Sequence, residues 1–468
     1  MSETAVLIIG GGISGLSTAW WLAQLGIPVE VWEAGKRAGG KIQTTTEAGY
    51  TTEQAAGLLV NFRNEIDQMI RQTGLSHRKR MRDETLNRYV VHQGELTQVP
   101  MLMPALLASP LWSLPAKLRL MAEVLIPRGH QEDETVSDFI KRRLGQEILD
   151  TAMDPFVAGT LASDPDLAEA RSVLPRLKAL EQRYGSLTMG MLINRVLKRR
   201  RANKADTFSF AGGMSDLIGV LADAPGVTLR CGMRVDSVSK VKSGWQVDAS
   251  RAGIRHQIST PHLVISTPAY AAADLLRPVD TSLGQLLSEI VYAPVAVLHV
   301  GLKNSDIRHP LDGTGFLVSR QNRLGFNGNL WMSRLFPGRA PDGNTLLTTY
   351  LGGARHPGQV DQSDEKLADI AMSGLRPLLG ISGSENYIRV DRHHQGLPLY
   401  HGRYQARLEQ IANRMARLSG LYLSANYENG VSVRERIFQG RQLAQKIAVT
   451  LKTGEEYSPL MPPLALAG

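Results

Sequence analysis

The sequence predicts an α/β protein that combines a Rossmann-like domain, a mixed α+β domain and a helical insertion. Three patterns support this prediction. Residues 5–33 have the order strand, helix, strand; residues 100–204 are mostly helical in pattern; and strand-like alternation returns at 227–249 and 263–267. The chain has 468 residues, 43% of them hydrophobic, which is enough for a sizeable core and two or three domains.

The first elements form a β-α-β unit. The apolar run AVLIIG at 5–10 predicts a strand, and LSTAWWLAQL at 16–25 has apolar residues at helical spacing. A second apolar run at 29–32 predicts the next strand. Further along, we expect a helix over residues 54–73 and a basic, strand-like stretch over residues 76–92.

Later segments indicate that the domains are discontinuous. After the mixed region 276–400, the run LYLS at 421–424 predicts another core strand, followed by a loop and a final helix at about 432–451. The predicted domains are residues 1–75, 205–275 and 415–452 for the Rossmann-like domain, 76–99 and 276–414 for the mixed α+β domain, 100–204 for the helical insertion, and 453–468 for a loose tail.

A glycine motif carries the clearest chemistry. Gly10, Gly12 and Gly15 fit G-x-G-x-x-G between the first strand and the first helix, and Glu33 ends the next strand. The glycines permit a tight turn, a close approach to a pyrophosphate and close packing of helix on strand. The helix N-terminus offers free N–H groups and positive potential, and Glu33 can accept hydrogen bonds from ribose hydroxyls.

Composition excludes several other classes of site. The single cysteine, Cys231, excludes a disulfide framework and a four-thiolate metal or iron–sulfur site within one chain. No histidine, aspartate or glutamate constellation has catalytic or metal-ligating spacing, so we expect no metal and name no catalytic residue. Cys231 also lies in a strand-like region remote from the glycine motifs, which favours a non-covalent cofactor.

Charge and hydropathy bear on partners and location. The net charge is +9, but the basic run at 198–201 has no interleaved aromatic residues, so we expect no nucleic-acid partner. The start of the chain has no basic region ahead of its apolar run, and no stretch of 18 apolar residues occurs. We therefore expect a cytoplasmic protein without a transmembrane helix.

A second glycine pair distinguishes FAD from NAD. Arg37, Gly39 and Gly40 resemble the extended fingerprint of the FAD-dependent amine oxidase superfamily, as does NYENGVSV at 426–433. In such flavoproteins the late helix N-terminus faces the flavin pyrimidine. The resemblance implies non-covalent FAD held by Gly10, Gly12, Ser14, Gly15, Glu33, Arg37, Gly39, Gly40, Val235, Gly430, Val431 and Val433.

Within this superfamily, DPFVAGTLASDPDLAEARSVLPRLKALEQRYGSL at 154–187 resembles the signature of the oxygen-dependent protoporphyrinogen oxidases. FSFAGGMSDL at 208–217 and LFPGRAPDGNTLLTTYLGGAR at 335–355 are also similar to that family, and the resemblance extends from residue 5 to 450. It implies an FAD-binding domain, a substrate domain with a β-sheet, and a helical domain on a membrane surface.

The resemblance also implies a substrate site. It places Arg88, in LNRYVV, where family members bind a propionate of the macrocycle, and Trp331 where an aromatic residue packs on a pyrrole ring. Trp331 departs from the usual phenylalanine or tyrosine, so the alignment is open there by a residue or two. Leu317, in GFLVS, is expected to be an apolar wall.

The implied activity is FAD-dependent oxidation of protoporphyrinogen IX to protoporphyrin IX, six electrons in three flavin cycles, with oxygen or a quinone as acceptor. Alternatives are coproporphyrinogen III oxidation, a flavin amine oxidase or desaturase of the same fold, and a non-enzymatic flavoprotein scaffold. The expected location is the inner face of the cytoplasmic membrane, held peripherally through residues 101–126. A buried hairpin or a dimer contact is the other interpretation of this segment, so a homodimer stays open.

Overall fold

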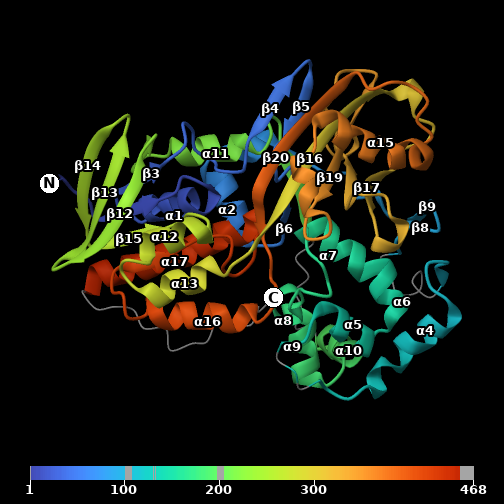
Figure 1. Cartoon of the computed structure of the whole chain (residues 1–468), viewed down its shortest axis with the longest axis horizontal. Helices are drawn as coiled ribbons and strands as arrows, with labels where there is room; N and C mark the ends of the chain where they lie inside the picture. The colour runs from blue at the N-terminus through green and yellow to red at the C-terminus, as the bar shows by residue number, and fades with distance from the viewer. Residues whose placement is uncertain (1, 101–107, 130, 132, 198–204, 454–468) are drawn as a thin grey trace.

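A five-stranded parallel sheet organises the Rossmann-like part of the fold (Figure 1). The structure, a computed structural model, describes residues 2–100, 108–129, 131, 133–197 and 205–453. The strand order is β11-β3-β2-β15-β21, and every neighbouring pair is parallel. The strands are β2 (Val6–Ile9), β3 (Val29–Glu33), β11 (Val227–Cys231), β15 (His262–Ile265) and β21 (Leu421–Leu423).

Both faces of this sheet are covered, which explains why its inner strands β2 and β15 and the neighbouring β21 are mostly apolar. Val6 and Ile8 pack on one side with α1 (Ile13–Gln24), α11 (Ser215–Ala222) and α17 (Val433–Thr453). Leu7 and Ile9 pack on the other side. That side is covered by α12 (Ala269–Leu276), α13 (Thr281–Ser288), α16 (Tyr404–Met415), and the antiparallel strands β12 (Arg234–Val241), β13 (Gly244–Arg251) and β14 (Ile254–Thr260), with β1 (Ser2–Glu3) beside β14.

A seven-stranded sheet forms the second layer system, in the order β20-β16-β19-β18-β17-β8-β9. One face packs against α15 (Asp364–Leu379), which supplies Leu367, Ala371 and Leu375 to a common apolar core. The strands are β8 (Asn87–His92), β9 (Glu95–Gln98), β16 (Tyr292–Lys303), β17 (Gly313–Leu317), β18 (Gly328–Trp331), β19 (Asn344–Gly352) and β20 (Tyr387–Pro398), and the short α14 (Met332–Leu335) follows β18.

Smaller sheets connect these two parts. The hairpin β4 (Thr44–Glu47) and β5 (Tyr50–Glu53) lies between them, as does a three-stranded sheet with the order β6-β10-β7. Its strands are β6 (Leu59–Asn61), β7 (Lys79–Met81) and β10 (Asp206–Phe210), and α2 (Asn64–Gln72) follows β6. The expected helix over 54–73 was therefore wrong in its first half, because Leu59–Asn61 pairs with β10, a strand far away in sequence.

The helical region between residues 108 and 197 is built around buried charges. Arg143 and Glu123 are fully buried and lie 3.1 Å apart, and Arg143 Nε donates to Glu181 Oε1 at 2.8 Å. Glu123 also accepts the backbone N–H of Leu187 at 2.9 Å, which caps α10. The helices are α4 (Leu114–Met121), α5 (Val136–Arg143), α6 (Gln146–Ile148), α7 (Asp154–Leu161), α8 (Ala170–Val173), α9 (Pro175–Tyr184) and α10 (Leu187–Val196).

In the described part of the chain, no helix has the length and apolarity needed to span a bilayer. The basic run at 198–201, most of the predicted tail and residues 101–107 lie outside the described residues.

Close packing of α17 on α1 predicts a specific sensitivity at Gly440. A Cβ there would lie 2.9 Å from the backbone N of Thr18, so Gly440→Ala should push the helices apart and destabilise the fold by about 1–3 kcal/mol. Gly219, in α11, has no neighbour within 4 Å of an added Cβ, and Gly219→Ala should be neutral or stabilising by up to about 1 kcal/mol. Thermal unfolding of both variants checks this, and equal melting temperatures would contradict it.

Candidate cofactor and substrate site

The turn between β2 and α1 forms the first part of the site. Gly10 has φ of +109° and its N–H donates to the carbonyl of Trp32 at 2.8 Å, a conformation that L side chains rarely adopt. α1 begins at Ile13, and Ser14 lies buried in its first turn. A Cβ added to Gly12 would meet no atom within 4 Å. The glycine turn therefore leaves open space in front of a helix N-terminus.

Glu33 ends β3 beside this turn. Its carboxylate oxygens accept the backbone N–H groups of Gly11 and Gly35, each at 2.7 Å. The carbonyl of Glu33 accepts the N–H of Met233 at 2.9 Å, which brings the start of β12, with Val235, next to the end of β3. Glu33 and Val235 therefore lie together at the carboxyl edge of the parallel sheet, as the sequence predicts for the ribose end of a dinucleotide.

The second glycine pair folds back onto the first. The N–H of Gly39 donates to the carbonyl of Gly11 at 2.7 Å, and Gly39 pairs with Gly12 as an isolated bridge. Arg37 Nη1 donates to the carbonyl of Ala38 at 2.9 Å, and Nη2 to that of Gly40 at 3.2 Å. Arg37 therefore stabilises the loop that closes on the open space.

The late loop reaches the same region because α17 packs on α1. Gly430 and Val431 precede α17, which begins at Val433. Arg436, only 1% exposed, donates to the carbonyls of Ala425 and Glu428 and so fixes the shape of this loop. The sequence analysis did not single out Arg436; its position one turn into a helix after a glycine loop was the only available signal.

These residues fit FAD. The open space at Gly12, the N-terminus of α1 and the carboxylate at Glu33 are complementary to a pyrophosphate and a ribose. The N-terminus of α17 would supply further positive potential to such a cofactor. No group of three or more His, Cys, Asp or Glu side chains in the described part of the chain is arranged to hold a metal ion.

Arg88 and Leu317 lie on the face of the seven-stranded sheet opposite to α15. Val90 and Leu317 are paired in register and belong to an apolar cluster with the helical region. Because side chains alternate along a strand, Arg88 in β8 faces the same side as Val90. The structure therefore brings two of the three predicted substrate residues to one surface, between the sheet and the helical region.

Trp331 does not join them. Its side chain is 0% exposed and packs in the core under α15, with its ring 5.8 Å from that of Tyr89 and 5.1 Å from that of His309. The preceding residue, Leu330, takes the opposite face, the one shared with Arg88. We expected Trp331 to pack on a pyrrole ring, but its side chain points into the core. The residue on the face of Arg88 is Leu330, one position earlier.

Apolar residues that the sequence analysis missed line the shared face. Leu330, Leu58 and Leu86 are partly buried and pack in one cluster with Met332. Tyr350 lies opposite Gly328 on the same face, next to the pair of Leu317 and Gly328. Leu58 follows Gly57 in the segment between β5 and β6. The cluster therefore extends from the FAD-binding part of the fold to the seven-stranded sheet.

Two titratable groups between the two sheets, Glu53 and His299, are buried and have polar partners. Glu53 lies 2.9 Å from Arg339, and both are nearly inaccessible to solvent. His299 Nδ1 lies 2.9 Å from Thr348 Oγ1, and burial lowers the pKa of His299 to about 4 although Asp391 opposes the shift. His299 is therefore neutral at pH 7, and Glu53 is held in an ion pair.

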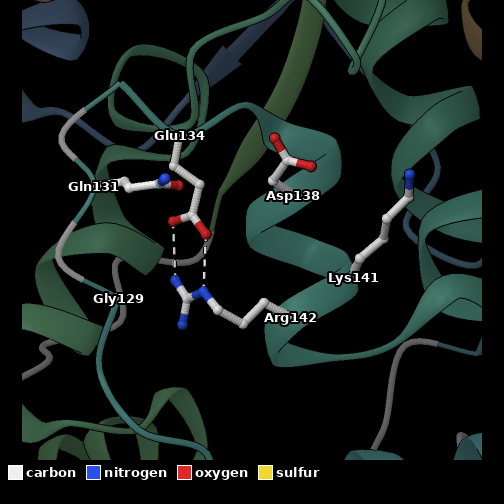
Figure 2. Close-up of a pocket in the computed structure, with 6 residues that line it drawn as sticks. All are labelled: Gly129, Gln131, Glu134, Asp138, Lys141 and Arg142. Carbon is white, nitrogen blue, oxygen red and sulfur yellow. Dashed lines mark hydrogen bonds and ion pairs between the residues drawn. The ribbon is translucent and has the colours of Figure 1, made fainter.

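A surface hollow in the helical region is a different feature (Figure 2). Two parallel hydrogen bonds, 2.8 and 2.9 Å long, join Arg142 to Glu134, and Arg142 also reaches Glu181 at 2.8 Å. None of the predicted site residues lies here. Its lining consists of Gly129, Gln131, Glu134, Asp138, Lys141 and Arg142.

Comparison with known proteins agrees with this geometry. The sequence profile described as "Flavin containing amine oxidoreductase" matches residues 13–448. The chain belongs to this family. Membership implies FAD as the cofactor, and the resemblance to the protoporphyrinogen oxidases is confirmed by the relatives that follow.

Mitochondrial protoporphyrinogen oxidase of Nicotiana tabacum is 28% identical over 97% of this chain and 96% of its own length. Coproporphyrinogen III oxidase of Bacillus subtilis is 26% identical over 93% and 96%. Among solved structures, a protein from Exiguobacterium sp. superposes with a TM-score of 0.79 at 21% identity, covering 96% of this chain and 99% of that one. A reduced UDP-galactopyranose mutase reaches 0.73 at 16% identity, covering 97% of each chain.

The open space at Gly12 predicts the effect of filling it. Gly12→Asp would place a side chain and a negative charge where a bound pyrophosphate is expected, and should reduce bound FAD to below about a tenth of the normal content. Flavin absorbance of the purified protein measures this. Gly358, also open and not in the left-handed region, offers the control Gly358→Asp, which should keep its FAD. A full flavin complement in Gly12→Asp would reject the assignment.

Proposed function

We propose that this protein oxidises a porphyrinogen, specifically protoporphyrinogen IX to protoporphyrin IX, with non-covalent FAD and with oxygen or a quinone as the final acceptor. The observation that carries the proposal is the apolar face of Leu317, Leu330 and Tyr350 with the cationic edge at Arg88. A porphyrinogen has the complementary shape: an apolar ring with carboxylates at its edge. Relatives that span nearly the whole chain carry porphyrinogen oxidase names.

The chemistry suits a site without a general base. FAD, when bound, accepts a hydride from a methylene bridge of the substrate. The resulting cation is delocalised onto the pyrrole nitrogens, one of which loses its proton, so the substrate supplies much of its own stabilisation. This agrees with His299 and Glu53, which are buried and already hydrogen bonded or ion paired.

The side chains of the protein would contribute by orienting the substrate and excluding water. The apolar wall of Leu317, Leu330 and Tyr350 excludes water from the ring. Arg88 fixes the rotation of the ring, because a guanidinium can hold a carboxylate in two parallel hydrogen bonds. Rate enhancement in such a site comes from orientation and from exclusion of water rather than from proton transfer to a side chain.

Anaerobic flavin bleaching tests the proposed reaction. The purified holoenzyme should lose its oxidised flavin absorbance on mixing with protoporphyrinogen IX, and should do so at least about tenfold more slowly with coproporphyrinogen III, whose two extra carboxylates need further cations. Putrescine and benzylamine serve as amine controls. Faster bleaching by coproporphyrinogen would reassign the substrate, and bleaching by the amines alone would reject the function.

We also propose peripheral attachment to the inner face of the cytoplasmic membrane. In α4 and the turn after it, Leu114, Leu118 and Leu125 are exposed, Leu125 by 80%. This turn packs against α10, whose Val196 is 70% exposed. A patch of this kind, rimmed by Lys117, suits the interface of a bilayer with anionic headgroups.

The structure corrects part of the expected membrane segment. Leu111 and Trp112 are buried in the core of the helical region, and Trp112 Nε1 donates to Thr151 Oγ1 at 2.7 Å. Arg119 donates to the backbone carbonyls of Arg142 and Arg143, so it stabilises the helical region instead of facing headgroups. Five of the apolar residues expected at the membrane lie outside the described part: Met101, Leu102, Met103, Leu106 and Leu107.

Co-sedimentation with liposomes tests the attachment. The protein should pellet with anionic vesicles at low salt, and Leu118→Asp combined with Leu125→Asp should reduce the bound fraction at least about fivefold. Ile254, also exposed but in the distant β14, gives the control Ile254→Asp, which should bind normally. Equal binding of the double variant and the control, or no binding of the unchanged protein, would reject the membrane proposal.

A further inference from the structure

Two arginines flank one tight turn beside the proposed substrate face. Arg82 follows β7, and Arg88 lies near the start of β8. The turn between them is closed by the N–H of Leu86, which donates to the carbonyl of Asp83 at 3.4 Å, and by the N–H of Thr85, which donates to Asp83 Oδ1 at 2.9 Å. The turn reverses the chain, so the two guanidinium groups come from neighbouring strand ends.

Arg82 lies on the same face of the three-stranded sheet as an exposed apolar residue, Val60. Its N–H donates to the carbonyl of Thr207 at 2.8 Å, which continues the ladder one position beyond the pair of Met81 and Phe208. Thr207 pairs in turn with Val60, and residues paired across a ladder share a face. Val60 is 38% exposed although apolar. This face therefore presents a cation beside an uncovered apolar residue.

The same face looks toward the seven-stranded sheet. Ser209, two residues along β10 from Thr207, accepts a hydrogen bond from Arg339, which belongs to the loop before β19. Leu86, inside the turn, packs with Leu58 and Leu330. The turn thus lies against the apolar wall described above, with one arginine on either side of it.

Neither arginine is neutralised by the described part of the protein. No carboxylate there forms an ion pair with Arg82 or Arg88, whereas Arg78 and Lys79 in the same stretch pair with Asp216 and Asp206. The Nε of Arg82 is buried and has no hydrogen-bond acceptor. A buried donor without an acceptor is costly.

The neighbouring Asp83 offsets the charge of Arg82 only in part. Its side chain is exposed and accepts both hydrogen bonds of Thr85, and these bonds, with a smaller contribution from the charge of Arg82, lower the pKa of Asp83. Burial and the positive charge of Arg82 lower the pKa of Arg88, which indicates that the two guanidinium groups are near enough to repel. Two adjacent cations with no ion-paired carboxylate among the described residues are unfavourable, and a ligand with two carboxylates at one edge would relieve this.

We propose that Arg82 and Arg88 together bind two neighbouring carboxylates of the substrate, one propionate on each guanidinium, so that the site selects a ring whose two propionates lie on the same edge. This rests on the proposed function and deepens it, because Arg88 alone would orient the ring by one propionate only. Two guanidinium groups, each holding a carboxylate in two parallel hydrogen bonds at one edge, fix the rotation of the macrocycle. They also determine which methylene bridge faces the interior of the site. Arg82 is thus a specificity-determining residue.

Steady-state kinetics with substrate esters test the pair. We compare Arg82→Ala, Arg88→Ala and the double variant, using protoporphyrinogen IX as the free diacid and as the dimethyl ester. With the diacid, each single variant should raise KM by about tenfold to a hundredfold, the range for hydrogen bonds to charged groups. The double variant should raise KM further than either single variant, because each single variant still holds one propionate. With the diester, all variants should match the unchanged protein.

Two controls separate the role of the pair from general effects. Arg255→Ala removes an exposed charge from the distant β14 and should leave KM within about twofold. Arg82→Lys keeps the charge without the fork and should fall between Arg82→Ala and the unchanged protein. Flavin absorbance should show normal FAD content in every variant, because the cofactor residues lie in other segments.

Equilibrium binding gives a readout that does not depend on turnover. Protoporphyrin IX, titrated into the oxidised holoenzyme and followed by its fluorescence, should bind at least about tenfold more weakly to Arg82→Ala than to Arg255→Ala. Equal effects of Arg82→Ala on diacid and diester, or a KM equal to that of Arg255→Ala, would overturn the pair while leaving the oxidase intact. If no porphyrinogen reduces the flavin of the unchanged protein, the proposed function itself fails.

Discussion

The parallel arrangement of β2, β3, β11, β15 and β21 is the constraint on which the rest of the structure depends. Parallel strands deliver all their carboxyl ends to one edge, and the chain uses this to bring together loops from residues 10, 33, 232 and 424. Both faces of the sheet must be buried, so α1 and α17 pack closely on one side. The position of the late loop at the cofactor follows from that packing.

The local signals in the sequence predicted the elements around the glycine turn well. The glycine turn, Glu33 and the final helix are each specified by residues within a few positions of one another, and their geometry is imposed by backbone conformation and helix ends. The same holds for the strands at 227–249, which alternate clearly in sequence. Such features need no knowledge of distant partners.

Which residues face the proposed substrate surface depends on strand register, and a single sequence does not reveal the register. Trp331 and Leu330 differ by one position, and a one-residue shift exchanges the two faces of a strand. The helix expected over 54–73 begins only at Asn64, because Leu59–Asn61 pairs with β10 more than 140 residues later. Arg82 lies in a basic stretch, and such stretches are usually solvent-exposed. The only local signal that Arg82 lies beside the substrate face was the Asp-Glu-Thr turn that follows it.

Close contact between α1 and α17 at Gly440 determines the order in which parts of the protein can fold during translation. The first eighth of the chain contains nearly all of the phosphate-binding turn, yet β21 and α17 must leave the ribosome before the late loop can meet it. Contacts between such distant segments form slowly, since the loop that joins them has to close first. During translation the nascent chain therefore carries an incomplete glycine-turn region until β21 and α17 have emerged.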